Sequence, residues 1–594
     1  MRQLKIQIII LLALFGLSGA CSDESNPAYS AVVEEIQAPM EEGELLKGVA
    51  WNEDVYVLSF ETKQVNVPVG LVQQVEADSL RWRTVLTLTN GSSYIIPSIG
   101  TSIDGLIANV VLNPSGYNPL SANVTMNLPA LGHMKVVVHS KPDSHTPDVE
   151  YLFHSIEKGQ TVTILGLYPD YANQVELIYT DKQGKERGRS SLEIKTGSLT
   201  GIYLPRQFNV WKIDASQMEL GMNLVNSPGE SEADTSVPYM VDADGCIRWV
   251  LDWRNHPTLN HAGLQCGLHR LKNGNYVTGD ANNHQLVEVD VLGNVVNTCD
   301  LKSFGFTYHH EVRETEEGKW IVAITNTQAK LANSNQSRIL DHMAEFDPAI
   351  GELTKVWDFV QMLDSSRMVR ADQDIPGSDV YGQSKSNWLH NNGVDLFENG
   401  DMLCTARWMG TFRFTRSGSI KWVIAPHDRW KEPFKKYLLT PLDRNGNAIT
   451  DQEVLNGKKV HPDFDWVWGV HCPVVLSNGH VMFFDNGYCR NYESQHDTYY
   501  SRAVEYEIDE KAMTIRQVWE FGKELGMPYY ANAISGVQEL KQTGNRLFCP
   551  GTGGPHIVEV NPKTQEIVFD LEVKSNSNMA FHRANRISLY PDNM

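Results

Sequence analysis

Short runs of alternating apolar and polar residues fill the chain from about residue 45 onward. Asp54–Leu58, Thr84–Leu88 and Lys135–Val138 are three such runs, and turn-forming pairs such as Asn90-Gly91 separate them. Successive side chains of a β-strand point to opposite faces of a sheet, so a period of two indicates strands. We expect residues 44–198 to form one or two β-sandwich units.

From about residue 200 one element recurs six times. It consists of a turn, a short strand-like run and a bulky closing residue that is usually followed by an acid. The six copies are Asp244–Trp249, Leu292–Asp300, Gly351–Asp358, Ser417–Trp422, Thr514–Glu520 and Lys563–Asp570. A repeat on this scale is typical of β-propellers, and each copy has the form of the outer hairpin of a four-stranded blade.

A second repeated element, strand–turn–strand, precedes most of these copies. Its turns lie in Leu268–Gly274, Glu317-Gly318, Phe397–Gly400, Leu476–Gly479 and Thr543-Gly544. Asn-Gly is a strong hairpin signal, so these segments predict the inner hairpins of the blades. The fold class predicted is therefore all-β, with a six-bladed propeller over residues 199–594 behind the β-sandwich region.

The first 21 residues have the pattern of an export signal. Arg2 and Lys5 precede the apolar run Ile6–Leu17, and small residues follow up to Cys21. Residues 1–21 therefore predict a lipoprotein signal peptide with Cys21 as the lipidated residue, and polar residues 22–43 predict a tether. The expected location is the periplasm or the cell surface, with the membrane reached only through the lipid. An ordinary secretory signal with an incidental cysteine is the alternative.

Charge and cysteine content limit the possible partners. The formal net charge of −21 argues against nucleic-acid binding, and an anionic substrate would need a local basic pocket. Seven cysteines remain besides Cys21, without a CxxC pair or zinc-like spacing. The cysteines therefore give no sign of a zinc site, and we expect no bound cofactor.

Three of the 19 histidines occupy equivalent places in successive repeats. His310, His390 and His471 each stand near the start of an inner hairpin, eight or ten residues before its turn glycine. Equivalent positions of neighbouring blades converge on the propeller axis, so the three imidazoles should meet in one pocket. Arg407, on the strand after the Asn399-Gly400 turn, offers a cation.

Three interpretations of this cluster stay open at this point. Three histidines are able to bind zinc or copper, although such a site normally adds a carboxylate or thiolate. Asn392 and Arg407 favour an anion site instead, because a guanidinium matches a sulfuryl or phosphoryl group. Because the histidines are paired with these residues and not with carboxylates or thiolates, we expect that no metal is needed. The third interpretation is that the histidines are structural residues of the propeller throat.

Longer segments around these residues resemble a known family, the bacterial arylsulfate sulfotransferases that need no nucleotide sulfate donor. The resemblance covers roughly residues 120–594. The segments that carry it are Ser386–Asp395, Thr405–Arg407, Phe464–His471, Phe483–Gly487, Ser501–Asp509 and Gln517–Glu524.

The resemblance implies a homodimeric, exported enzyme with a six-bladed propeller and an N-terminal β-sandwich. It implies that His471 is transiently sulfated, so that a phenolic sulfate donor and a phenolic acceptor react in a ping-pong sequence. The implied partners of His471 are His310, His390, Arg407 and the substrate-binding Asn392. A threonine of some members matches Ile534 or Ser535, and we assign substrate binding to Ser535. Some members have a disulfide in the insertion before Phe464, where this chain has no cysteine.

These residue types suit sulfuryl transfer. A neutral imidazole is a competent nucleophile near pH 7, and a covalent intermediate divides one transfer into two similar steps. Trp388, Trp408 and Trp468 are candidates for holding an aryl ring, although each also fits a blade core. An exported propeller oxidoreductase and a noncatalytic binding propeller are the alternative functions.

Overall fold

The computed structural model of the chain describes residues 46–592 with internal gaps. The gaps are 53, 61–63, 79–82, 92, 98–102, 104–105, 129–130, 158, 228–236, 261, 263–266, 281–282, 327–337, 368, 370–385, 494–498 and 576–579. The predicted signal and tether, including Cys21, lie outside the described residues. Among the residues described, no helix is long and apolar enough to cross a membrane.

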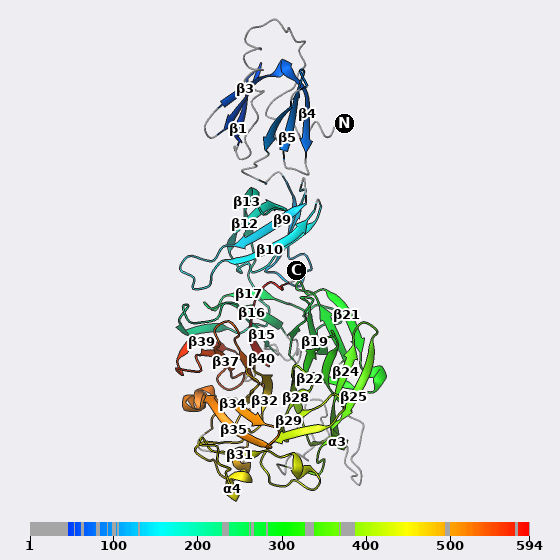
Figure 1. Cartoon of the computed structure of the whole chain (residues 1–594), viewed down its shortest axis with the longest axis vertical. Coiled ribbons are helices and arrows are strands. Elements are labelled where there is room, and N and C mark those ends of the chain that lie inside the picture. Colours follow the sequence, from blue (N-terminus) through cyan, green and yellow to red (C-terminus); the bar gives the residue numbers. More distant parts are fainter. Residues whose placement is uncertain are drawn as a thin grey trace.

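Two small β units precede the main body (Figure 1). The first has two three-stranded antiparallel sheets, β1 (Leu46–Asn52), β2 (Val55–Phe60), β3 (Gln64–Pro68) and β4 (Val72–Asp78), β5 (Arg83–Leu88), β6 (Ser93–Pro97). The second has a sheet of order β11-β8-β7 and a sheet of order β10-β9-β12-β13. Its strands are β7 (Ile107–Leu112), β8 (Ala122–Met126), β9 (Gly132–Val138), β10 (Val149–Ile156), β11 (Thr161–Ile164), β12 (Ala172–Asp181) and β13 (Glu186–Lys195). Buried positions alternate along β12, as the period of two predicts.

Six sheets of four or five antiparallel strands follow in the described residues, and each is one blade of a propeller. Blade 1 has β15 (Met222–Ser227), β16 (Val237–Val241), β17 (Ile247–Val250) and β40 (Arg583–Ile587); blade 2 has β18 (His269–Arg270), β19 (Tyr276–Asp280), β20 (Gln285–Val289) and β21 (Val295–Asp300); blade 3 has β22 (Thr307–Glu314), β23 (Trp320–Asn326), β24 (Arg338–Asp347) and β25 (Glu352–Asp358). Blade 4 has β27 (Asn391–Leu396), β28 (Met402–Ala406), β29 (Gly410–Phe414) and β30 (Ile420–Ile424); blade 5 has β32 (His471–Val475), β33 (Val481–Asp485), β34 (Arg502–Asp509) and β35 (Thr514–Phe521); blade 6 has β36 (Gly536–Glu539), β37 (Arg546–Cys549), β38 (His556–Val560) and β39 (Ile567–Lys574).

The rest of the regular structure lies at the blade edges. Strands β14 (Gln207–Ile213) and β31 (Thr440–Leu442) extend blades 6 and 5, β26 (Ser386–Asn387) pairs with β24, and α3 (Phe359–Met362) and α4 (Gln452–Leu455) are single helical turns. The six sequence repeats fall on β17, β21, β25, β30, β35 and β39, each the fourth strand outward in its blade. The predicted all-β propeller is confirmed.

Strands from the two ends of the propeller sequence close the ring. β14 pairs with β39 in blade 6, and β40 pairs with β15 in blade 1. The innermost strands β22, β27, β32, β36 and β40 pack against one another in succession around the centre. Gly393 on β27 permits this close approach, because a Cβ there would lie 2.4 Å from Cδ of Pro473 in blade 5.

The second β unit is attached to blade 1 and to the C-terminal segment. Arg248 of β17 is fully buried, donates to the carbonyl of Gly166 and lies 3.6 Å from the ring centroid of Tyr168. The hydroxyl of Tyr590 accepts a hydrogen bond from Leu165 N–H at 2.8 Å and donates to the carbonyl of Thr163 at 3.1 Å. These buried contacts fix the unit on the propeller.

Tyr590→Phe should lower the stability of this junction by about 1–3 kcal/mol, since it leaves the buried Leu165 N–H without its acceptor. Differential scanning calorimetry would show a lower Tm for the transition that includes the second β unit. Tyr203→Phe, at a half-exposed tyrosine, is the control and should leave the Tm unchanged. An unchanged Tm for Tyr590→Phe would contradict the role given to its hydroxyl.

Candidate active site

His471 begins β32, the innermost strand of blade 5, and is buried. Its Nδ1 lies 2.7 Å from Oδ1 of Asn486 and 2.9 Å from the carbonyl of Gly469. The Asn486 amide cannot be reversed, because its Nδ2 donates to the carbonyls of Ala531 and Ile534. Both neighbours of Nδ1 are therefore acceptors, so Nδ1 carries the proton and Nε2 keeps the lone pair.

Electrostatics keep this imidazole neutral. Burial is the largest cause that holds the pKa of His471 well below its ordinary value of 6.5, and the positive charges of Arg407 and Arg583 act in the same direction. The hydrogen bond to Asn486 opposes them but does not reverse the shift. His471 thus presents an unprotonated Nε2 at neutral pH.

A buried ionic network holds the loops on either side of His471. Asp485 accepts hydrogen bonds from the backbone N–H groups of Trp468 and Gly487, and it pairs with Arg490 at 2.8 Å and with Arg502 at 2.9 Å. Burial alone would raise the pKa of Asp485, but the two guanidinium groups outweigh burial and hold it below its ordinary value. The ionised Asp485 therefore fixes the segment before His471 and the turn that carries Asn486.

His310 and His390, from blades 3 and 4, meet at the centre of the ring. Their Nε2 atoms are 3.3 Å apart. His471 is close enough to affect the pKa of His310, and His390 to affect that of His471. The carbonyl of His390 also accepts a hydrogen bond from the backbone N–H of Arg407. The structure thus brings together the three histidines and the arginine that the sequence analysis selected.

Left-handed backbone marks the same place in four successive blades. The φ angles are 57° at His310, 56° at His390, 51° at Cys472, and 48° and 87° at Ile534 and Ser535. Such conformations are strained for residues other than glycine and cluster at functional sites. In blade 5 the residue with left-handed backbone is Cys472. His471 therefore lies one residue before the position that His310 and His390 occupy in their blades.

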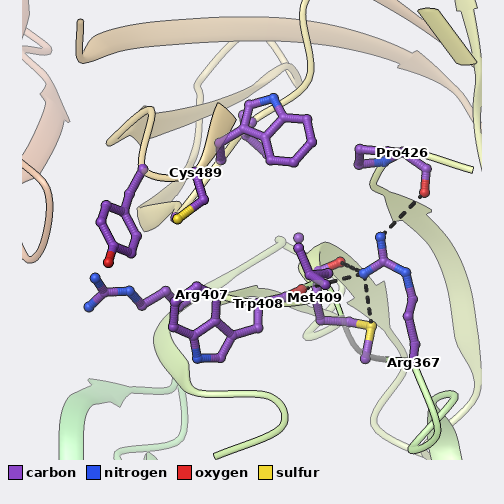
Figure 2. A pocket seen from close by; sticks show the side chains of 12 residues that line it. Arg367, Arg407, Trp408, Met409, Pro426 and Cys489 are labelled. Atoms are coloured by element: carbon purple, nitrogen blue, oxygen red, sulfur yellow. Dashed lines mark hydrogen bonds between the residues drawn. The ribbon is translucent and has the colours of Figure 1, made fainter. Parts of the chain in front are cut away.

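Arg407 borders a small cavity between blades 4 and 5 (Figure 2). Its Nη2 donates to the carbonyl of Asn532 at 3.2 Å, and its guanidinium carbon lies 4.9 Å from the Tyr488 ring centroid and 5.2 Å from that of Trp408. The cavity also reaches Gly469, whose carbonyl contacts His471. An arginine, aromatic side chains and the loop of the central histidine therefore line one cavity.

Arg367 stands opposite Arg407 in Figure 2 and has a different environment. Its guanidinium is buried and contacts the carbonyls of Trp408, Met409 and Pro426 at 3.4–3.5 Å. Burial lowers the pKa of Arg367 to about 10. These contacts tie three loops together, so we assign Arg367 a role in shaping the cavity.

Asn392 and Ser535 lie at the site, but the structure also gives them structural contacts. The Asn392 side chain donates to the carbonyl of Val470 at 2.8 Å and accepts from the Thr405 hydroxyl at 2.7 Å, so it joins blade 4 to the residue before His471. The Ser535 hydroxyl donates to the carbonyl of Ala533 and accepts from Gly551 N–H. Their substrate-binding role stays a prediction.

The three candidate tryptophans differ in burial and in their access to the cavity. Trp388 is fully buried in the core between blades 3 and 4 and is not available to a ligand. Trp468 belongs to the core of blade 5 and borders the cavity with one part of its ring. Trp408 is only half-buried and lines the cavity beside Arg407. Trp408 is therefore the best placed of the three to contact an aryl ring.

The sequence analysis missed four residues that the fold brings to the site. Asn486 lies in Phe483–Gly487, one of the segments that carry the family resemblance, so that segment was the signal that could have identified it. Arg583 of β40 gives its Nη2 to Glu311 of blade 3 and to the carbonyl of Asn392 of blade 4. His309 and His582 lie beside His310, with ring centroids 5.2 Å and 5.8 Å away. No local pattern distinguished them, because they come from the chain end or stand beside a stronger candidate.

The described part of the chain contains no group of three or more His, Cys, Asp and Glu side chains with the geometry of a metal site. Five cysteines in that part are free thiols: Cys246, Cys299, Cys404, Cys472 and Cys549.

Comparisons with known proteins agree with the resemblance. A family model described as arylsulfotransferase (ASST) matches residues 207–583, and one described as arylsulfotransferase Ig-like domain matches residues 109–197. The chain is similar to arylsulfate sulfotransferase AssT of Escherichia coli O6:H1 strain CFT073, with 26% identity over 81% of this chain and 92% of that protein. It is also similar to arylsulfate sulfotransferase AssT of Lelliottia amnigena, with 25% identity over 82% of this chain and 94% of that protein.

Solved structures resemble the chain only distantly. A Bacteroides caccae protein of unknown function covers 61% of this chain with 97% of its own length, at a TM-score of 0.36 and 10% identity. Virginiamycin B lyase of Staphylococcus aureus covers 61% of this chain with 87% of its own length, at a TM-score of 0.30 and 11% identity. At TM-scores this low the likenesses carry no argument.

The hydrogen bonds of His471 predict one tautomer that NMR is able to detect. With ¹⁵N-labelled histidine, Nδ1 of His471 should give the signal of a protonated nitrogen and Nε2 that of an unprotonated one. This neutral pattern should persist at pH 6, because the lowered pKa keeps the imidazolium from forming there. His471→Gln assigns the signal, and Asn486→Ala should weaken the tautomer preference. A protonated Nε2 in the unaltered protein would contradict the assignment.

Proposed function

The chain belongs to the arylsulfotransferase family and is an aryl sulfate sulfotransferase, and on that premise we propose that it works through a sulfohistidine at Nε2 of His471. A phenolic sulfate ester donates the sulfuryl group, and a phenol accepts it in a second step. The observation that carries this proposal is the hydrogen bond between His471 and Asn486, because it leaves Nε2 as the nucleophilic atom.

The first half-reaction is the attack of Nε2 on sulfur. The S–O bond to the aryl group breaks, its electron pair leaves on the phenolate oxygen, and the sulfuryl group stays on Nε2. Positive charge then develops on the imidazole. The Nδ1 proton, held by the Asn486 and Gly469 oxygens, disperses that charge. In the second half-reaction the acceptor oxygen attacks sulfur and the S–N electron pair returns to Nε2.

Arg407 is the proposed ligand of the transferring group. By analogy with phosphoryl transfer, the transition state is loose and carries negative charge on the three sulfuryl oxygens. A planar guanidinium matches two such oxygens at once. The effect of Arg407 on the pKa of His471 supports its closeness to the reacting nitrogen.

Proton transfer and aryl binding complete the scheme. His390, the half-exposed member of the histidine pair, gives a proton to the leaving phenolate and later removes one from the acceptor. Trp408 and Tyr488 provide aromatic surface for the phenol in the cavity beside Arg407.

Export, lipid attachment and dimerisation are further parts of the proposal. Residues 1–21 and Cys21 support an exported lipoprotein at the periplasm or cell surface. The family resemblance supports a homodimer. A phenol-modifying enzyme in that location would meet substrates from outside the cell.

The proposed covalent step predicts one product burst per active site. With 4-nitrophenyl sulfate and no acceptor, the enzyme should release nitrophenol once and gain about 80 Da at His471, while added phenol should give continuous turnover. His471→Ala should lose both signals, because no other residue supplies the nucleophile. His154→Ala, at an exposed histidine of the second β unit, is the control. An equal adduct on the His471→Ala protein would assign the role to another residue.

If Arg407 binds the sulfuryl oxygens, its replacement by lysine should reduce activity less than its replacement by methionine. Arg407→Lys keeps the charge but loses the two-pronged donor set, so it should retain part of the activity. Arg407→Met removes both and should slow single-turnover sulfation of His471 about a hundredfold, which corresponds to roughly 3 kcal/mol. The loss should appear in the chemical step and not in the Tm. A stable Arg407→Met enzyme with the wild-type sulfation rate would exclude this role.

A further inference from the structure

A chain of three imidazoles leads from the site into blade 3. Nε2 of His390 lies 3.3 Å from Nε2 of His310, and Nδ1 of His310 lies 3.0 Å from Nδ1 of His309. Each contact joins two ring nitrogens, so one nitrogen of each pair carries a proton and donates it. His390 is half-exposed, whereas His310 and His309 are buried. The chain therefore has an outer end at His390 and an inner end at His309.

A buried carboxylate stands at the inner end. Oδ1 of Asp341 on β24 lies 3.6 Å from Nε2 of His309, and these side chains are 2% and 3% exposed. Oδ2 of Asp341 accepts a hydrogen bond from Asn391 N–H at 3.1 Å, which orients the carboxylate. At 3.6 Å the pair is an ion pair rather than a hydrogen bond, so Asp341 favours a positive charge on His309 without taking its proton.

We propose that His309 and Asp341 form the inner end of a proton relay through His310 and His390, which stores on His309 the proton exchanged with the phenols. This inference rests on the sulfotransferase function proposed above and names the residues that carry its acid–base step. His309 acts through its neighbours and is a positioning and storage residue.

The number of protons on the relay is the same before the first half-reaction and after the second. As the ester S–O bond breaks, His390 Nδ1 gives its proton to the phenolate, and His390 Nε2 takes the proton of His310 Nε2. His310 Nδ1 then takes the proton of His309 Nδ1, which leaves His309 neutral. The acceptor phenol later gives its proton to His390 Nδ1, and the three shifts reverse. One proton leaves with the first phenol, and one returns from the second.

The electrostatic environment of His310, the middle imidazole of the chain, suits a residue that transfers a proton without retaining it. Burial is the largest cause that holds the pKa of His310 well below its ordinary value, and the neighbouring imidazoles of His390, His309, His582 and His471 lower it further. A positive charge is therefore unfavourable on His310. The carboxylate of Asp341 stands at the inner end of the chain, so it stabilises a stored positive charge on His309.

Other charged and titratable groups lie near the relay. Arg583 pairs with Glu311 beside His310. His342 faces Asp358 at 3.5 Å, and burial is the largest cause that lowers its pKa; Asp341 and His309 also affect that pKa, so His342 is too close to the relay to serve as a control. The matched control is His556→Gln, at a buried histidine of blade 6 whose Nδ1 lies 2.6 Å from Asp570.

The test compares two donors that differ in their need for a proton. Phenyl sulfate releases a weakly acidic phenol, whereas 4-nitrophenyl sulfate releases a more acidic one that leaves as the anion. His309→Gln and Asp341→Asn should slow the first half-reaction of phenyl sulfate about a hundredfold, and that of 4-nitrophenyl sulfate less than about threefold. His556→Gln should leave both rates unchanged. Equal losses for both donors would show a structural role for His309 and overturn the relay.

A measurement on the unaltered enzyme decides the matter if the variants do not fold. The rate of phenyl sulfate turnover in mixtures of H₂O and D₂O should fall along a curve, because several protons move together. A straight line, which means that a single proton moves, would overturn the relay while leaving the sulfotransferase function intact. An unaltered enzyme that turns over neither donor would overturn both proposals.

Discussion

One buried guanidinium holds the centre of the propeller together. Arg583, on the last strand of the chain, donates to the carbonyls of Ser535 in blade 6 and Asn392 in blade 4 and pairs with Glu311 in blade 3. It belongs to blade 1 through the pairing of β40 with β15. Removing one partner of a buried ion pair typically costs about 3–5 kcal/mol, so the arrangement of four blades depends on this residue. Glu311 follows His310, Ser535 follows Ile534, and Asn392 lies two residues after His390, so each partner is at or near a residue with left-handed backbone.

The same centre places positive charge inside an acidic protein. The chain carries a net charge of −21, yet burial, and after it the charges of Arg407 and Arg583, lower the pKa of His471 and keep its imidazole neutral. Asn486 supplies the acceptor for Nδ1, and the ionised Asp485 next to it fixes the turn through Arg490 and Arg502. Rigid blades, rather than mobile loops, thereby position the reactive nitrogen, which is the arrangement that preorganised catalysis requires.

The repeats predicted the blades because each repeat is a local pattern of turn, strand and bulky residue. His310, His390 and His471 were predictable from their equivalent places in three repeats, and Arg407 from the strand beside them. Ring closure was not predictable in this way, since β14 pairs with β39 and β40 with β15 across most of the chain. Asn486, His309 and Asp341 were missed for a related reason: their importance lies in which neighbour each one contacts. The one-residue offset of His471 was not predictable either: the register of the inner strand shifts near its start in blades 3, 4 and 5 alike, and the sequence does not mark the position of the shift.

In the proposed intermediate, Nε2 of His471 carries the sulfuryl group while Nδ1 remains bound to Asn486. A crystal structure of the enzyme soaked with an aryl sulfate in the absence of acceptor would capture this intermediate. We expect tetrahedral density for a sulfuryl group joined to Nε2 of His471, with its oxygens near Arg407 and with the contact between Nδ1 and Asn486 retained. A sulfuryl group on Nδ1, on His310 or on His390 would exclude Nε2 of His471 as the nucleophile.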